Sequence, residues 1–178
     1  KKYKHQELIQ IKFKDYLFTD IWVNVKFKVI LKQTFISDVS ILENVHSLDL
    51  SYCENITDVS MLGHTLNLSF CTNIKMLGNV KTMWNCHTLD LSYCENIIDV
   101  SMLVNVHTLN LSYCKNIIDV SMLGNVHTLN LSHCENIIDV SMLGNVHTLN
   151  LSYCENITDV SMLGNVNALD LVNCKIYI

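Results

Sequence analysis

The sequence predicts an α/β solenoid, in which short parallel strands and short return turns stack one coil on the next. The first observation is a repeat: the letters HTLNLSYCENITDVSMLGNV at residues 147–166 recur with few changes at 127–146, 107–126 and 87–106, and altered copies precede them. A fixed period of this length is typical of solenoids. The second observation is that each unit begins with alternating apolar and polar residues, as a short strand does.

The strand of each unit carries two leucines. We number the unit V-H-T-L-N-L-S-Y-C-E-N-I-T-D-V-S-M-L-G-N as positions 1 to 20. In T-L-N-L-S, the leucines at positions 4 and 6 should point inward, and positions 3, 5 and 7 should point outward. Seven strands are therefore expected, with the leucine pairs Leu48/Leu50, Leu66/Leu68, Leu89/Leu91, Leu109/Leu111, Leu129/Leu131, Leu149/Leu151 and Leu169/Leu171.

The second half of each unit returns the chain to the next strand. C-E-N-I predicts a turn, and D-V-S-M-L predicts one short helical or 3-10 turn whose free N–H groups are capped by the Asp. In G-N, the glycine would supply any positive φ that the corner requires. One unit buries too few apolar groups to offset the entropy of ordering it, so neighbouring units must share a core.

Residues 1–34 do not repeat, and we expect them to form a capping segment for the solenoid at 35–178. Residues 4–18 predict a helix. Residues 21–31 alternate as a strand that continues the sheet. The alternating apolar residues of this strand are Val23, Val25, Phe27, Val29 and Leu31.

An irregular insertion, KTMWNC, occupies residues 81–86. It predicts a bulged loop around Trp84, which is either a tolerated insertion or a recognition loop. Cys86 lies in this insertion, and we expect its thiol to be exposed and to react before the other cysteines.

The consensus L-x-L-S-x-C-x-N-I-x-D-V-S-x-L resembles the leucine-rich repeat. Its cysteine is similar to that of the cysteine-containing repeats of F-box proteins, and I-T-D-V-S-x-L is similar to the internalin-type repeat. The resemblance covers about residues 35–178 and implies a parallel β-sheet on one face and short helical or 3-10 turns on the other. It does not identify a partner. The unit is shorter than both types, and residues 1–34 also resemble the tail of an F-box.

Cysteine occupies position 9 of every coil. Stacked coils would place neighbouring Cα atoms about 4.8 Å apart with parallel Cβ vectors, so neighbours should not form disulfides. We expect buried thiols whose weak S–H donors face turn carbonyls, which suits a reducing, cytoplasmic location. No C-x-x-C spacing is present, so no metal and no cofactor is expected. The position-9 residues are Cys53, Cys71, Cys94, Cys114, Cys134, Cys154 and Cys174.

Composition and spacing also bear on the class of function. Residues 1–34 hold eight lysines and three acidic residues, whereas residues 35–178 hold four lysines and fourteen acidic residues. Nucleic acid is therefore not expected as a partner, because phosphate binding needs a basic face. No apolar run approaches the roughly 18 residues that span a bilayer, so no membrane partner is expected.

A histidine row at position 2 repeats identically from coil to coil. An active site needs different groups that converge, so we expect no catalytic residues and no enzyme. The row consists of His46, His64, His87, His107, His127 and His147.

The outward strand face is the candidate binding surface. It presents Thr at position 3, Asn or Asp at 5, Ser at 7 and an aromatic residue at 8, a polar and almost uncharged surface that suits a protein or peptide partner. The alternative is that the aromatic row only covers the edge of the core. The candidate partner-binding residues are Asp49, Tyr52, Asn67, Phe70, Asp90, Tyr93, Asn110, Tyr113, Asn130, His133, Asn150 and Tyr153.

The function that these patterns favour is a non-catalytic protein–protein interaction scaffold that binds its partner on the strand face. One alternative is an F-box-type substrate receptor or adaptor for ubiquitin ligation. A second is a structural repeat protein that self-associates through its C-terminal end, where Ile176, Tyr177 and Ile178 follow the last strand.

Overall fold

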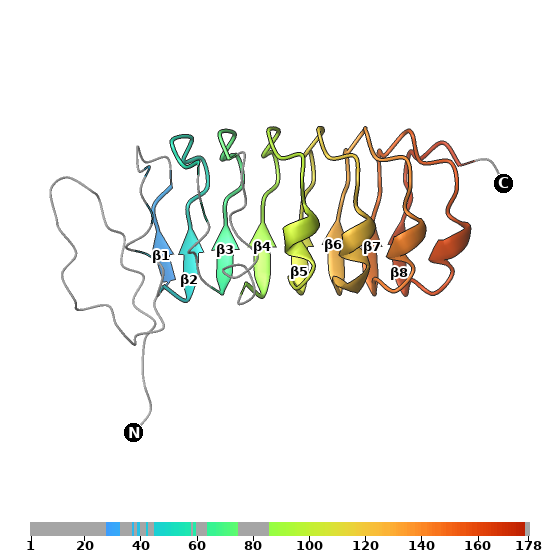
Figure 1. The fold of residues 1–178 in the computed structure, drawn as a ribbon, viewed down its shortest axis with the longest axis horizontal. Coiled ribbons are helices and arrows are strands. Elements are labelled where there is room, and N and C mark those ends of the chain that lie inside the picture. The colour runs from blue at the N-terminus through green and yellow to red at the C-terminus, as the bar shows by residue number, and fades with distance from the viewer. Residues whose placement is uncertain are drawn as a thin grey trace, which may run out of the picture.

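The described part of the chain is a single row of stacked coils (Figure 1). In this computed structural model each coil contributes one strand, and the strands lie side by side in chain order. The described residues are 28–32, 45–57, 64–74 and 86–176, with Ser37, Val39, Leu42 and Val59 as single residues.

One parallel sheet of eight strands forms one side of the solenoid, in the order β1 to β8. Its register follows the repeat, because Leu109 pairs with Leu89 on one side and Leu129 on the other. Each coil therefore advances the sheet by one strand spacing. The strands are β1 (Lys28–Ile30), β2 (Ser47–Asp49), β3 (Thr65–Asn67), β4 (Thr88–Asp90), β5 (Thr108–Asn110), β6 (Thr128–Asn130), β7 (Thr148–Asn150) and β8 (Ala168–Asp170).

The predicted solenoid of parallel strands is confirmed. Each of strands β2 to β8 contains the first leucine of a predicted pair, and the second leucine directly follows the strand. β1 pairs with β2 ahead of them. β1 lies within the strand predicted at 21–31, whereas residues 21–27 and the helix predicted at 4–18 lie outside the described residues.

Short 3-10 turns form the return side of the coils. The Asp at position 14 accepts a hydrogen bond from the backbone N–H of the Ser that begins each turn, as between Asp119 and Ser121 at 2.9 Å. This confirms the predicted capping role of the aspartate. The turns are η3 (Ser101–Leu103), η4 (Ser121–Asn125), η5 (Ser141–Leu143) and η6 (Ser161–Leu163).

One continuous apolar core runs between the sheet and the return turns. The four coils from 86 to 165 contribute the same seven positions, which in the coil that begins at Val106 are at most 1% exposed. Burying one such side chain contributes about 2 kcal/mol, and stacking lets each coil share that burial with its neighbours. In that coil the seven are Val106, Leu109, Leu111, Cys114, Ile117, Val120 and Leu123.

The predicted role of the glycine at position 19 is wrong. Gly144 and Gly164 both have φ of −61°, in the right-handed helical region. Glycine is needed here because the backbone of the next coil approaches closely. A Cβ on Gly144 would lie 2.5 Å from the carbonyl oxygen of Met162 in that coil. A Cβ on Gly124 would meet the carbonyl oxygen of Met142 in the same way.

The insertion leaves the sheet register intact. Leu66 of β3 still pairs with Leu89 of β4, although the intervening chain is longer than one unit. The loop predicted around Trp84 lies outside the described residues.

Cys86 is described, and the expectation of an exposed thiol is wrong. The side chain is 1% exposed, and burial raises the pKa of the Cys86 thiol to about 12.

Candidate partner-binding surface

The position-5 side chains on the strand face are held in place by the backbone. Asn110 Oδ1 accepts a hydrogen bond from the N–H of Ser112 at 3.1 Å, which closes a turn of the kind that Asn and Asp favour. Because the carboxamides and carboxylates are fixed in this way, their row along the sheet is preorganised. The same contact is made by Asp49, Asn67, Asp90, Asn130, Asn150 and Asp170.

The position-7 serines do not belong to this outward surface, so their prediction is wrong. Their side chains are 7 or 8% exposed in the four coils from 87 to 166. The chain leaves the extended conformation after the second leucine, and alternation between the two faces stops there. The four serines are Ser92, Ser112, Ser132 and Ser152.

Position 8 carries the left-handed turn of each coil. Tyr113 has a φ of 62°, and every described residue at this position has a φ between 58° and 63°. The left-handed conformation costs a residue with a Cβ roughly 1 to 2 kcal/mol. Backbone pairing compensates part of it, because the N–H of Tyr93 donates to the carbonyl of Ser112 in the next coil at 2.9 Å.

The aromatic side chains at position 8 stack face to face as one ladder. Successive ring centroids are 4.1 to 4.4 Å apart with interplanar angles of 6° to 12°. Each such pair contributes about 0.5 to 1.5 kcal/mol beyond burial. The rings remain partly exposed, with Tyr52 at 45% and Tyr153 at 41%. We name the six rings the aromatic ladder: Tyr52, Phe70, Tyr93, Tyr113, His133 and Tyr153.

The position-9 cysteines form a second ladder beneath the aromatic one. Cys134 Sγ donates to the carbonyl of Leu111, one coil earlier, at 3.1 Å, and the equivalent distances in the other coils are 2.9 to 3.2 Å. The predicted pairing of S–H donors with turn carbonyls is confirmed. Burial raises the pKa of the Cys134 thiol to about 12, so the proton that the bond needs stays in place.

Comparison with known proteins decides the class of repeat. Residues 42–62 and 145–163 match the family model described as a leucine rich repeat. The chain contains leucine-rich repeats.

Two internalins of Listeria monocytogenes are among the solved structures to which the chain is similar. Internalin C2 is 22% identical with a TM-score of 0.55, over 80% of this chain and 71% of that chain. InlF is 18% identical with a TM-score of 0.49, over 85% of this chain and 55% of that chain. At these identities the likeness to internalin C2 establishes the fold alone. No curated protein sequence matches the chain significantly.

Within this leucine-rich repeat protein, the predicted binding residues fall into the position-5 row and the aromatic ladder beside it. Asp49 is the exception, because it is only 8% exposed and pairs with Lys32 Nζ at 3.0 Å. Burial opposes ionisation of this carboxyl, but hydrogen bonds from Lys32 and Ser51 outweigh it and lower the pKa of Asp49. Asp49 therefore holds the first coils together through these contacts and adds little to the exposed surface.

A third ladder borders the strand face at position 2. The imidazoles of His87, His107, His127 and His147 stack with centroids 4.5 to 4.6 Å apart. Partial desolvation and the neighbouring His87 and His127 lower the pKa of His107. Asn167 ends the row, with its Nδ2 lying 3.1 Å from His147 Nε2.

The position-9 row contains only cysteines, and the position-2 row contains histidines up to Asn167. Among residues 28–176 where the structure describes them, no three His, Cys, Asp or Glu side chains are grouped to hold a metal ion. The described residues also contain no helix with the length and apolar character needed to cross a membrane.

Two features of the return side were missed from the sequence. The first is an asparagine ladder at position 11, where Asn116 Nδ2 donates to the carbonyl of Glu95, one coil earlier, at 2.8 Å. The identical Asn at this position in six of the seven coils was the signal that could have revealed it. Equivalent bonds of 2.6 to 2.8 Å are made by Asn73, Asn96, Asn136 and Asn156.

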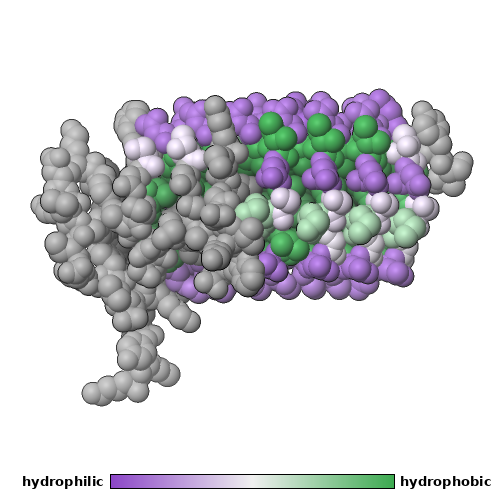
Figure 2. Space-filling view, viewed as in Figure 1, coloured by the Kyte–Doolittle hydropathy of each residue, from purple (hydrophilic) through white to green (hydrophobic). Residues whose placement is uncertain are grey.

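The second missed feature is an exposed apolar surface at positions 13 and 17. Figure 2 shows it as bands that run along the solenoid, with hydrophilic groups between them. We name this surface, with the Asp at position 14, the return face. Its exposed apolar side chains are Ile98, Ile118, Ile138, Met122, Met142 and Met162.

Proposed function

We propose that this leucine-rich repeat protein is a non-catalytic scaffold that binds a protein or peptide partner through its strand face. The observation that carries the proposal is the aromatic ladder, a rigid and partly exposed row of stacked rings beside preorganised polar side chains. Aromatic anchors dominate the binding energy of protein interfaces. Rings that are already fixed lose little entropy when a partner binds.

Replacement of the rings by asparagine tests this proposal. Asparagine tolerates a positive φ, and Asn173 already occupies position 8 of the last coil with a φ of 58°. The variant combines Tyr93→Asn, Tyr113→Asn and Tyr153→Asn, so it removes three rings and keeps the backbone conformation.

A matched control changes the opposite side of the same coils. Ile98→Thr, Ile118→Thr and Ile138→Thr introduce a residue that position 13 already contains at Thr57 and Thr158. Peptides selected from a random displayed library on the parent chain should bind the asparagine variant about thirtyfold more weakly, a loss of about 2 kcal/mol. Their affinity for the threonine variant should change less than about twofold. Equal binding to the parent and the asparagine variant would overturn the proposal.

We also propose that the protein works in a reducing, cytoplasmic compartment. The support is the cysteine ladder, since all eight cysteines are free thiols and the buried ones donate through S–H. Alkylation of protein taken from its native source, with and without prior reduction, tests this. Equal labelling after denaturation supports the proposal, and additional labelling after reduction contradicts it.

Self-association through the last coil is a second candidate. Val172 is 57% exposed, and Leu169 and Leu171 are only partly buried, unlike their counterparts in earlier coils. Sedimentation of the full chain across a dilution series should show an increasing mass, which Val172→Lys should reduce. A constant monomer mass at high concentration would remove this candidate.

A further inference from the structure

The return face exposes several large apolar side chains to solvent. Ile98, Ile118 and Ile138 are 61 to 64% exposed, and Met142 and Met162 are each 61% exposed. These side chains recur at one-coil intervals, so they line up in bands along the solenoid (Figure 2). Clustered apolar surface of this kind marks interaction sites.

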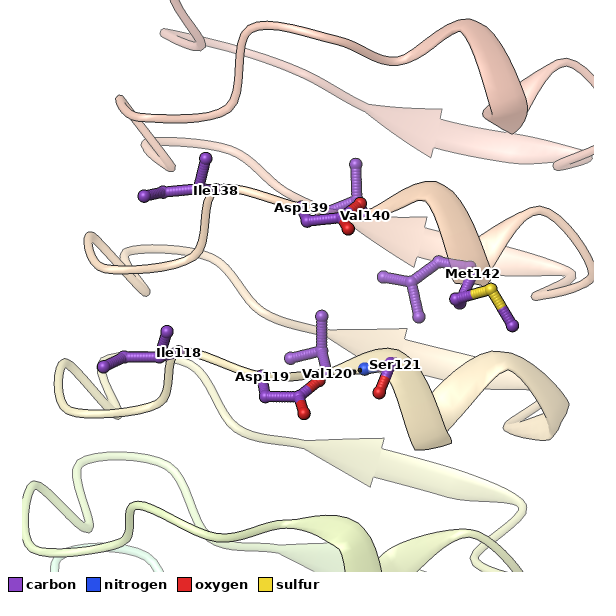
Figure 3. A pocket seen from close by; sticks show the side chains of 9 residues that line it. Ile118, Asp119, Val120, Ser121, Ile138, Asp139, Val140 and Met142 are labelled. Atoms are coloured by element: carbon purple, nitrogen blue, oxygen red, sulfur yellow. Dashed lines mark hydrogen bonds between the residues drawn. The ribbon is translucent and has the colours of Figure 1, made fainter.

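The bands enclose hollows between successive coils. One hollow of about 410 Å³ lies between the coils at 107–126 and 127–146, and a second of about 250 Å³ lies one coil further on. Figure 3 shows Ile118 and Ile138 at one end of the first hollow and Met142 toward the other. Apolar side chains therefore lie toward both ends of the first hollow.

A carboxylate row separates the two apolar bands. Asp119 and Asp139 line the first hollow, and Asp139 and Asp159 line the second. Each carboxylate accepts a hydrogen bond from the N–H of a turn serine, at 2.8 to 2.9 Å. These bonds lower the pKa of the three aspartates, which are charged at neutral pH.

The described residues supply no cation to this row. Their three ion pairs join Lys32 to Asp49, Lys115 to Glu135 and Lys175 to Glu155. None of them involves the return-face aspartates. A partner that covers the apolar bands must bring its own positive charge to the carboxylates, because buried charges need partners.

We propose that the return face is a second interface, which binds an extended protein segment that alternates apolar side chains with lysine or arginine. The apolar side chains enter the hollows beside Ile138 and Met142, and the cations pair with Asp119, Asp139 and Asp159. The acidic row disfavours nucleic acid, anionic lipid and acidic peptides. This interface is independent of the strand face, since it uses the opposite side of the coils.

The probe for this proposal is a fluorescent octapeptide that alternates leucine and lysine, added to the full chain. A matched octapeptide of leucine and glutamate should show no saturable binding. Asp119→Asn, Asp139→Asn and Asp159→Asn keep an acceptor oxygen for the serine N–H groups, so the turns should be retained. This variant should bind the lysine peptide about tenfold more weakly.

Two control variants separate the interface from general charge attraction. Glu95→Gln, Glu135→Gln and Glu155→Gln remove the same charge from position 10 and should change affinity less than about twofold. The variant with Ile98→Thr, Ile118→Thr and Ile138→Thr should lose about fivefold. Equal losses in the aspartate and glutamate variants, or no loss in the threonine variant, would overturn the proposal.

Methionine methyl NMR locates the peptide without relying on any variant. The methyl signals of Met142 and Met162 should shift on addition of the lysine peptide, and unshifted signals would contradict the proposed site. The variant with Tyr93→Asn, Tyr113→Asn and Tyr153→Asn should bind this peptide as the parent does. Failure of the strand-face proposal therefore remains distinct from failure of this one.

Discussion

Cys134 donates its thiol hydrogen to the carbonyl of Leu111, 3.1 Å away and one coil earlier in the chain. The contact ties two coils together at a point where the strand has ended and the backbone N–H of Cys134 bonds within its own coil, to the Leu131 carbonyl. It also leaves no space for a larger side chain, because Cys134 is completely buried. The identical cysteine in successive coils is thus explained by stability and not by thiol chemistry.

Replacement of this thiol should destabilise the solenoid. Cys134→Ala leaves the Leu111 carbonyl without its donor and opens a small cavity, so we expect a loss of about 1 to 3 kcal/mol. Cys174→Ala is the matched control, because Cys174 is only partly buried, and it should cost less than about 1 kcal/mol. Urea unfolding of both variants measures the difference, and equal costs would contradict the assigned role.

Thiol reactivity should follow burial. Cys174 is the most accessible of the cysteines, whereas Cys86 and Cys134 are buried and burial raises each pKa to about 12. We expect native labelling, mapped by mass spectrometry, to modify Cys174 first and Cys86 slowly. All eight should react alike in denaturant. Early modification of Cys86 in the native protein would contradict this order.

The glycines at position 19 should differ in their tolerance of a Cβ. Gly144→Ala brings a methyl group against the carbonyl oxygen of Met162, whereas Gly164 has nothing within 4 Å of the equivalent point. Gly144→Ala should therefore cost about 1 to 3 kcal/mol. Gly164→Ala should be neutral or stabilise by up to about 1 kcal/mol, because φ is already helical. Thermal unfolding checks both, and a stabilising Gly144→Ala would contradict the close approach.

The stability of the fold should decline in mild acid. Desolvation and the adjacent His87 and His127 lower the pKa of His107 in the folded chain. The unfolded chain then binds more protons as pH falls below its pKa of about 6.5, so stability is full above that pH and declines below it. We expect a lower Tm at about pH 5.5 than at about pH 7.

Substitution of the stacked imidazoles provides the control for this effect. Combined His107→Gln, His127→Gln and His147→Gln should largely remove the decline. The return-face aspartates have lowered pKa values, so their contribution is lost only at still lower pH, below the unfolded value of about 3.8. An unchanged decline in the triple variant would show that the histidine row is not its cause.

The sequence was sufficient to predict the stacking of the coils, because stacking depends on which residues recur. The leucine pairs, the cysteine ladder and the Asp119 cap each follow from one residue type at one period. The conformation of each corner was harder to predict. Glycine and the aromatic residue share the same period, and periodicity alone does not say which of them adopts a positive φ. The left-handed turn falls at Tyr113, and this also buries Ser112.

The candidate surfaces were predicted only in part. The aromatic ladder lies on the edge of the strand face, as the strand pattern indicated. The return face was missed because Ile118 and Met122 stand next to core residues in the sequence, and only the placement of the turn exposes them. Cys86 was wrongly expected to be exposed because it lies in an insertion. An insertion in the repeat can still end in a buried residue.

Side-chain oxidation by hydroxyl radicals, with and without a peptide selected on the parent chain, tests the central claim most directly. Binding at the strand face predicts that Tyr93, Tyr113 and Tyr153 become protected, while oxidation of Met142 and Met162 on the opposite side stays unchanged. Unchanged tyrosine oxidation together with protected methionines would contradict it, and would place the partner on the return face instead.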